Sequence, residues 1–236
     1  GWLTRFQALE YICGFNLDRR AYDIWNCITV APGAVSGLRR SAVLAAGGWS
    51  ADTMAEDTDL TLQLQRRGYR VTYCSKAWGW TEAPENVLAL VRQRVRWAFG
   101  TLQCLWKHRD MVFRRGGGAL AYFSLPSIWF FHIMLVALIP VVDLMLISSL
   151  LSGGDLALAQ YALLFLLVDC LLAGAACLME GEPLRLALNI IPIRLPNGRI
   201  LPWGVGAALV RALRGAWMEW GKLERKGNVV LPTGGF

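Results

Sequence analysis

Three carboxylates stand close together in the stretch MAEDTDLTLQLQRRGYR, which covers residues 54–70. They are Glu56, Asp57 and Asp59, and an amphipathic helix is expected to begin among them. Backbone N–H groups at the first turn of a helix stabilise negative charge and fix the direction of a carboxylate. Asp57 is therefore suited either to cap this helix or to act as a general base. Taken alone, the pattern favours the cap, because aspartates are common at that position.

Asp57 and Asp59 also have the DxD spacing that holds Mg²⁺ or Mn²⁺ on a nucleotide diphosphate. In enzymes that use nucleotide sugars this pair normally follows a strand, whereas here it begins a helix. The metal-binding interpretation is therefore the weaker one, and no metal ligand is predicted among residues 1–236. Asp59 is expected to face solvent or to cap the helix.

A second group of functional side chains lies in RQRVRWAFG, residues 92–100. Gln93, Arg96 and Trp97 have the spacing i, i+3 and i+4, which places them on one face of a helix. The planar guanidinium of an arginine binds a pyrophosphate at two points, and an indole stacks on a sugar or a base. Arginines beside a membrane also extend along apolar surface with their charge in water, and the spacing by itself does not separate these two roles.

Helices and short strands are predicted around these side chains. Apolar spacing predicts a helix over residues 3–22, and β-branched residues predict strands over 26–30 and 69–74. Further helices are predicted within 41–49, 59–68 and 84–108, the first two of these ending at glycines. This alternation indicates an α/β fold. The strands are too few for a complete sheet, so others are expected before Gly1, and the chain, which lacks an initiator Met, is expected to be a piece of a longer protein.

The middle of the chain has the composition of a membrane segment. No Lys or Arg occurs from residue 116 to 184, and 55% of all residues are hydrophobic. Two apolar runs, 124–151 and 156–179, are each long enough to cross a bilayer. Basic residues flank both outer ends, which predicts a hairpin whose ends are cytoplasmic. A third apolar stretch, 200–220, contains two arginines and is expected to lie in the membrane interface as a helix. Asp143 and Asp169 are expected to face protein or water.

The net charge and the cysteine content limit the partners, the redox environment and the metal sites that can be expected. The net charge of +7 fits an anionic membrane surface, and no recognised nucleic-acid motif accompanies it, so nucleic acid is not an expected partner. The six cysteines show no metal-type spacing and are expected to be reduced, as in a cytosolic protein. His108 and His132 are isolated in the sequence and are not expected to bind metal.

The order of these motifs resembles that of the processive family 2 glycosyltransferases. The resemblance is carried by TVAPGAVSGLRRSAV, GGW, AEDTDL, TEAP and RQRVRW, all between about Ala8 and His108. Within the family the sequence is most similar to bacterial poly-N-acetylglucosamine synthases, with cellulose and hyaluronan synthases as more distant relatives.

The resemblance implies a role for each matching residue. Asp57 matches the aspartate of the family's (T)ED motif, the catalytic base, although Ala55 stands where relatives often have Thr. Glu56 is expected to orient the loop, and Gly33 to lie near the sugar. Gln93, Arg96 and Trp97 match the QxxRW motif, which borders the acceptor and the diphosphate of the donor. The implied fold is GT-A, and the implied cofactor is Mg²⁺ or Mn²⁺, with its ligands expected mainly in a missing N-terminal half.

The sequence therefore predicts an inverting glycosyltransferase that moves a sugar, GlcNAc by resemblance, from a UDP-sugar donor to a growing polysaccharide acceptor. Residues 1–115 are predicted to be the acceptor-side half of the catalytic domain. Residues 116–182 are predicted to be the transmembrane hairpin, and 183–236 an interfacial helix with a basic cytoplasmic tail. The predicted location is a bacterial inner membrane, crossed more than once by the protein, with the lipid bilayer as a partner. A non-catalytic scaffold or export subunit and a transferase that adds one sugar to a lipid carrier are the alternatives.

Overall fold

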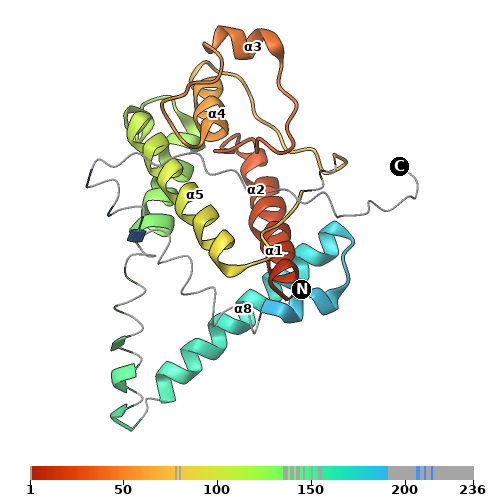
Figure 1. Cartoon of the computed structure of the whole chain (residues 1–236), viewed down its shortest axis with the longest axis vertical. Coiled ribbons are helices and arrows are strands. Elements are labelled where there is room, and N and C mark those ends of the chain that lie inside the picture. The colour runs from red at the N-terminus through yellow and green to blue at the C-terminus, as the bar shows by residue number, and fades with distance from the viewer. Residues whose placement is uncertain are drawn as a thin grey trace.

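The computed structural model describes residues 2–77, 79, 81–134, 138, 141, 144–145, 147–149, 151–153, 156–190, 206–207, 210 and 214. The described part is built from helices. α3 and α4 lie at one end of the molecule and α8 at the other, with the N-terminal helix and α5 between them (Figure 1).

The N-terminal helix runs without a break through three consecutive segments. α1 (Trp2–Tyr11) passes into a π-helical stretch, η1 (Ile12–Leu17), and then into α2 (Asp18–Ile24). It ends at Ile24, and the chain then turns at Asn26, whose φ of 49° is left-handed. A helix was expected over 3–22, and this prediction is confirmed with two further residues at the C-terminal end.

Three further helices hold the motif residues, and all three were predicted. They are α3 (Arg40–Ala45), α4 (Glu56–Arg66) and α5 (Val87–Lys107). α4 ends before Gly68, whose φ of 82° favours glycine. α5 begins later than predicted because Asn86 caps it, its side chain accepting the Ala89 N–H at 2.8 Å. Pro84 lies before the helix, where its carbonyl accepts a hydrogen bond from Gln7.

The two predicted strands, 26–30 and 69–74, are not strands in the described structure. A strand needs the backbone of a neighbour as its partner, and side chains take that place along residues 27–31. Ser124 Oγ donates to the Cys27 carbonyl at 2.8 Å, and the Ala31 N–H donates to Thr61 Oγ1 at 2.9 Å. Among the described residues, 69–74 have no neighbouring strand beside them. The Tyr69 N–H donates to the Leu64 carbonyl and so closes the turn that follows α4. The α/β layering predicted from sequence is therefore absent among the described residues.

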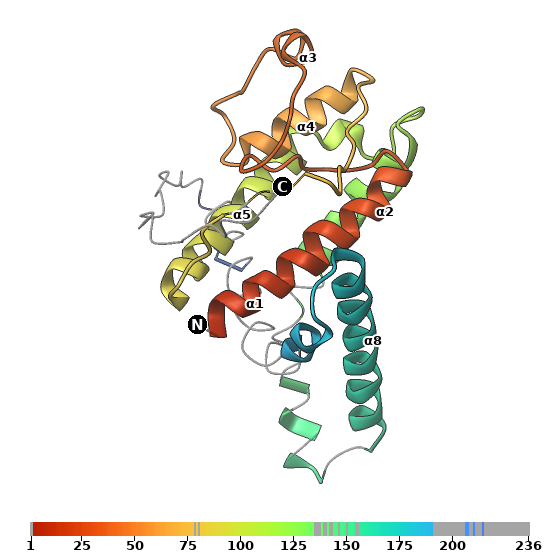
Figure 2. The same cartoon turned by 90° about the vertical axis from the view of Figure 1, so that its right-hand side faces the viewer.

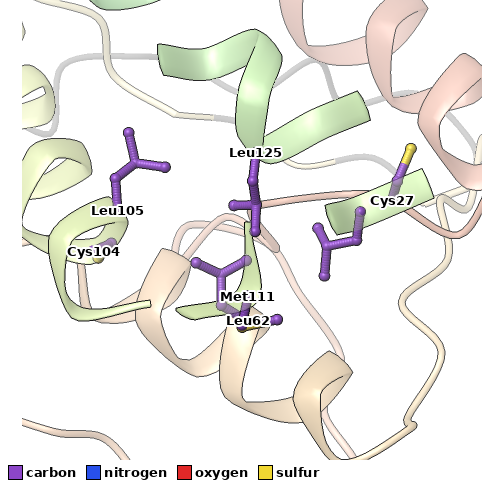
Figure 3. Packing of buried hydrophobic residues seen from close by; sticks show 7 residues of the cluster. Cys27, Leu62, Cys104, Leu105, Met111 and Leu125 are labelled. Carbon is purple, nitrogen blue, oxygen red and sulfur yellow. The ribbon is translucent and has the colours of Figure 1, made fainter. Parts of the chain in front are cut away.

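The largest apolar core joins α4, the C-terminal part of α5 and the segment that follows it. Leu62, Leu105 and Leu125 are almost fully buried in it, and Figure 3 shows their side chains converging with those of Cys27 and Met111. The segments that follow α5 are short: η2 (Arg109–Met111), η3 (Leu120–Ser124), α6 (Leu125–Ser127) and η4 (Ile128–Met134). This core fixes the position of α4 relative to α5.

α8 (Leu156–Glu180) is the element with membrane-like composition, and η5 (Leu184–Asn189) follows it. Its part from Leu163 to Glu180 is the one described segment long and apolar enough to cross a bilayer. Only 17% of that segment is buried, whereas the core helix of a soluble protein is mostly buried. Within it Asp169 is half-buried. Part of the first limb of the predicted hairpin, including Asp143, and most of the predicted interfacial helix lie outside the described residues.

The C-terminal end of α8 is attached to the N-terminal helix. Leu9 of α1 packs against Ala173 and Cys177 of α8, and all three are buried. Arg20 donates to Glu180 Oε1 from both Nε, at 3.1 Å, and Nη2, at 2.7 Å. Figure 2 shows α8 running away from this junction, with its other end far from α3 and α4.

Candidate active site

Asp57 lies in the first turn of α4, where both of its carboxylate oxygens accept a backbone N–H. Oδ2 accepts from Gly33 at 3.0 Å, and Oδ1 accepts from Thr58 at 2.7 Å. Two charge-assisted hydrogen bonds on opposite oxygens fix the direction of the carboxylate. The structure thus brings together Asp57 and Gly33, which are 24 residues apart in the sequence.

Thr61 holds the loop at 31–33 against α4, a role that the sequence analysis missed. Its Oγ1 donates to the Asp57 carbonyl at 2.6 Å and accepts the Ala31 N–H at 2.9 Å. The hydroxyl is almost fully buried. The signal available in the sequence was a threonine one helical turn after Asp57, where a hydroxyl can bond back to the i−4 carbonyl.

A pocket of about 400 Å³ opens beside this carboxylate. Its polar lining comes from Ser36, Glu56, Asp57 and Thr61, and its apolar lining includes Leu38 and Leu60. Trp49, from the GGW motif, also lines the pocket and keeps 58% of its surface exposed. An exposed indole beside a carboxylate is suited to stacking on a sugar ring while its hydroxyls face the acid.

Asp59 neither faces solvent nor caps the helix, so the prediction that it does one or the other is wrong. Its side chain is 0% exposed and turns away from the pocket toward the end of α5. His108 Nε2 donates to Oδ1 at 2.6 Å, and Lys107 Nζ donates to Oδ2 at 2.9 Å. Ser50 and Gln63 donate to Oδ2 as well. Burial alone would raise the pKa of Asp59, but the hydrogen bonds from His108, Ser50 and Lys107 outweigh it and hold the pKa well below its usual range.

These contacts exclude the metal-binding interpretation of residues 57–59. Residues two apart lie on opposite sides of a helix, so the carboxylates of Asp57 and Asp59 diverge. Asp59 is also fully used by four donors, one of them an ammonium group. Among the described residues, no three His, Cys, Asp or Glu side chains come together as a metal site. All six cysteines are free thiols.

α5 supports the loop that leads into α4 along its C-terminal half. The Met54 N–H donates to Gln103 Oε1 at 2.9 Å, and Cys104 Sγ donates to the Ala55 carbonyl at 3.3 Å. At Gly100 the helix is so close to this loop that an added Cβ would lie 2.8 Å from the Cβ of Ala55 and 2.9 Å from its backbone nitrogen. The helix that holds the second motif therefore also positions the first.

The N-terminal half of α5 faces α1 and η1. Gln93 is buried and Trp97 half-buried, and the Trp97 ring lies 6.1 Å from that of Phe15. Arg94, which the sequence analysis did not select, is buried between the two motif residues. It donates to Glu10 Oε2 at 2.5 Å and lies 4.6 Å above the centre of the Trp97 ring. Arg94 thereby fixes the orientation of the indole.

Two further arginines complete the region around these motifs. Arg96 is half-buried on α5, one turn after Gln93. Arg19 of α2 lies 4.9 Å above the Phe15 ring. Burial lowers the pKa of Arg19, and the nearby carboxylate of Asp57 is among the groups that oppose this shift. Arg19 was missed because the sequence offers no motif around it.

Comparison with known proteins identifies the family. Residues 1–177 match the family described as Glycosyl transferase family group 2. The chain therefore belongs to the family 2 glycosyltransferases, as the motifs predicted.

Named relatives agree with this assignment. The chain is 31% identical over 170 residues to "Probable glycosyltransferase YdaM" of Bacillus subtilis (strain 168), a match that covers 70% of this chain and 40% of that protein. It is 33% identical over 98 residues to the poly-beta-1,6-N-acetyl-D-glucosamine synthase of Staphylococcus aureus (strain COL), covering 42% and 24%. It is 30% identical over 156 residues to "Putative cellulose synthase 2" of Komagataeibacter xylinus, covering 63% and 10%.

The match spans less than half the length of each of these relatives. No solved structure matches the chain.

Proposed function

We propose that the protein transfers a sugar, GlcNAc from UDP-GlcNAc, to the end of a growing polysaccharide with inversion at the transferred carbon, and that Asp57 is the general base. Support for a polysaccharide product comes from the relatives named as a poly-beta-1,6-N-acetyl-D-glucosamine synthase and as a cellulose synthase. The observation that carries the proposal is the Asp57 carboxylate, held by two backbone N–H groups at the edge of a pocket large enough for a sugar unit.

The reaction needs the acceptor hydroxyl to lose its proton as it attacks the anomeric carbon. Asp57 takes that proton, because its oxygens are fixed in direction and retain lone pairs beyond the two backbone bonds. The bond from the anomeric carbon to the diphosphate breaks on the opposite face. General-base assistance of this kind contributes about 10²- to 10⁴-fold to the rate.

The other end of the reaction is assigned to α5. The departing UDP gains negative charge, and the guanidinium of Arg96 stabilises it. Trp97, oriented by Arg94, and Trp49 at the pocket offer ring faces for the sugar. A divalent cation is common in this family, but the described residues supply no set of ligands for it, so the proposed steps involve only side chains of this chain.

Attachment to a membrane is the second part of the proposal. The part of α8 from Leu163 to Glu180 exposes leucines and one aromatic residue, Phe165, and only 17% of it is buried. Such a face is stable in hydrocarbon and unfavourable in water. With the catalytic residues at the far end of the molecule, we place α8 in a bacterial inner membrane and the pocket on its cytoplasmic side.

The test of the proposed reaction is polymer synthesis by the complete protein in membranes supplied with radiolabelled UDP-GlcNAc. Asp57→Asn keeps the size of the side chain but removes its basicity, so incorporation is expected to fall by about 10²- to 10⁴-fold. Asp18→Asn changes an exposed carboxylate on α2 that does not line the pocket. It is the matched control and is expected to retain full incorporation.

Three outcomes decide among the alternatives. Equal incorporation by wild type and Asp57→Asn rules out Asp57 as the base. No incorporation by wild type from any UDP-sugar favours a non-catalytic subunit. Products that carry a single sugar on sizing favour transfer to a lipid carrier over polymer synthesis.

A further inference from the structure

Asp59 is the most heavily bonded carboxylate in the described part of the chain, and the proposed reaction does not use it. It is completely buried and accepts hydrogen bonds from Ser50, Gln63, Lys107 and His108. Removing one partner of such a buried charge leaves the other uncompensated and is strongly unfavourable. Because burying a carboxylate is so unfavourable, the burial of Asp59 points to a function for this residue.

Apart from Gln63, which lies on α4 itself, the donors come from two other parts of the fold, which Asp59 joins to α4. Lys107 is the last residue of α5 and His108 follows it, whereas Ser50 belongs to the loop between α3 and α4. Lys107 also donates to Ser50 Oγ at 3.1 Å and to Asp52 Oδ1 at 2.9 Å. We call the set Ser50, Asp59, Lys107 and His108 the Asp59 clamp. It fastens the first turn of α4 to the C-terminal end of α5.

Hydrogen-bond geometry assigns the tautomer of His108 in this clamp. Arg66 Nη2 lies 3.2 Å from His108 Nδ1, and a guanidinium only donates. Nδ1 must therefore accept, which places the imidazole proton on Nε2, where it is donated to Asp59. Arg66 is itself held by Asp110 at 2.7 Å. The donor and the acceptor of each hydrogen bond are thus assigned, so the clamp has a single hydrogen-bonding pattern.

The clamp acts on the same helical turn that presents the proposed base. Asp57 and Asp59 point to opposite sides of α4 because they are two residues apart. Fixing Asp59 on the α5 side therefore fixes where Asp57 stands on the pocket side. A displacement of about 1 Å at a reacting group can cost about 10²-fold in rate.

We propose that the Asp59 clamp is a positioning device for Asp57, with Asp59 and His108 as positioning residues that do not touch substrate. This inference rests on the proposed role of Asp57 as the base. It assigns a function to a carboxylate that stands beside the catalytic motif without belonging to it.

The experiment measures kcat and KM for UDP-GlcNAc with the complete protein in membranes, normalised to the folded amount. His108→Ala removes the donor to Asp59 Oδ1 and is expected to lower kcat about 10- to 100-fold with little change in KM. His108→Gln keeps an N–H donor close to the position of Nε2 and is expected to restore most of the loss. Arg67→Ala, at the exposed C-terminal end of α4, is the control and is expected to leave both constants unchanged.

A double-mutant comparison separates positioning from a general structural role. If His108 acts through Asp57, His108→Ala lowers the residual rate of Asp57→Asn no further. Losses that multiply, or a normal kcat for His108→Ala, overturn the inference. If His108→Ala does not accumulate as folded protein, Ser50→Ala removes one donor from the other oxygen and is judged by the same criteria.

The outcomes also separate this inference from the proposed function. An inactive Asp57→Asn together with a fully active His108→Ala overturns the clamp alone. An active Asp57→Asn overturns the proposed base and the clamp together.

Discussion

Asp57 and Asp59 differ by two positions in the chain, yet their surroundings have opposite character. Asp57 is half-buried at a pocket and bonded to backbone N–H groups. Asp59 is enclosed and bonded to side chains that include an ammonium group. The helical rotation of about 100° per residue produces this separation. As a result, the Asp57 carboxylate is accessible to a substrate, whereas the Asp59 carboxylate is enclosed by protein side chains.

Asp59→Asn is expected to destabilise the protein by about 3 to 5 kcal/mol at pH 7, because it removes the buried anion that accepts from His108 and leaves Lys107 only the exposed carboxylate of Asp52. The pKa of Asp59 is depressed in the folded state, so the unfolded state binds more protons at low pH. Its contribution is therefore present above the unfolded pKa, about 3.9, and is lost as pH falls through the folded pKa. Thermal unfolding in detergent, followed by tryptophan fluorescence from pH 7 to pH 3, measures both effects.

Asp110→Asn is the control for this measurement. Asp110 is also paired with an arginine, but it is 56% exposed, so its loss is expected to cost less than about 1 kcal/mol. An Asp59→Asn variant that loses stability with acid as steeply as wild type would contradict the account of Asp59.

α5 is the element that joins the two motifs of the site. Its first half orients Trp97 against η1 through Arg94, and its second half supports Met54 and Ala55 through Gly100, Gln103 and Cys104. One rigid helix therefore sets the distance between the proposed base and the residues assigned to the leaving group. Shifts of this helix change both ends of the reaction together.

Gly100→Ala tests this role of α5, because the new methyl group would overlap the backbone and Cβ of Ala55. We expect a destabilisation of about 1 to 3 kcal/mol from overpacking, with a fall in polymer synthesis as α5 moves away from the loop. Unfolding midpoints and incorporation of labelled sugar measure the two effects.

Gly14→Ala is the matched control on another helix. Nothing lies within 4 Å of the position where its Cβ would stand, so about 0.5 to 1 kcal/mol of stabilisation is expected. Equal stability of the two alanine variants would show that α5 does not pack against the loop in this way.

The described part of the molecule joins a helical region that holds Asp57 and the QxxRW motif to one strongly apolar helix. The junction is small and specific, with Leu9 against Ala173 and Cys177 beside the Arg20–Glu180 ion pair. On the N-terminal side of this junction, α8 exposes most of its leucines. This distribution supports a catalytic part held at one end of a helix that enters lipid.

Leu171→Lys places a charge near the middle of the apolar part of α8, where Leu171 is 65% exposed. If this helix crosses a bilayer, insertion is expected to become less favourable by about 2.5 to 3.5 kcal/mol. The fraction of protein that resists alkaline extraction from membranes measures the loss.

Leu44→Lys is the control, since Leu44 is 63% exposed on α3 at the opposite end of the molecule. Its extraction should match that of wild type. Identical extraction of both lysine variants would argue that α8 does not cross a membrane.

The amino-acid sequence by itself determined the helices and the motifs. Apolar spacing, the glycines after α3 and α4, and the order of the ED and QxxRW residues are local signals, and they placed α1 to α5 and the family correctly. Local signals also suggested strands at 26–30 and 69–74. These predictions failed because a strand requires a neighbouring backbone, and side chains bond the described segment 27–31 instead.

Only the tertiary structure decided what each polar side chain contacts. Asp59 and His108 are 49 residues apart, Asp57 and Gly33 are 24 apart, and Arg94 and Glu10 are 84 apart. No local pattern encodes such pairs, because the partner is brought near only when helices pack. The sequence therefore predicted which residues could react, whereas the packing of α4 on α5 determined which carboxylate faces the pocket and which one is enclosed between the helices.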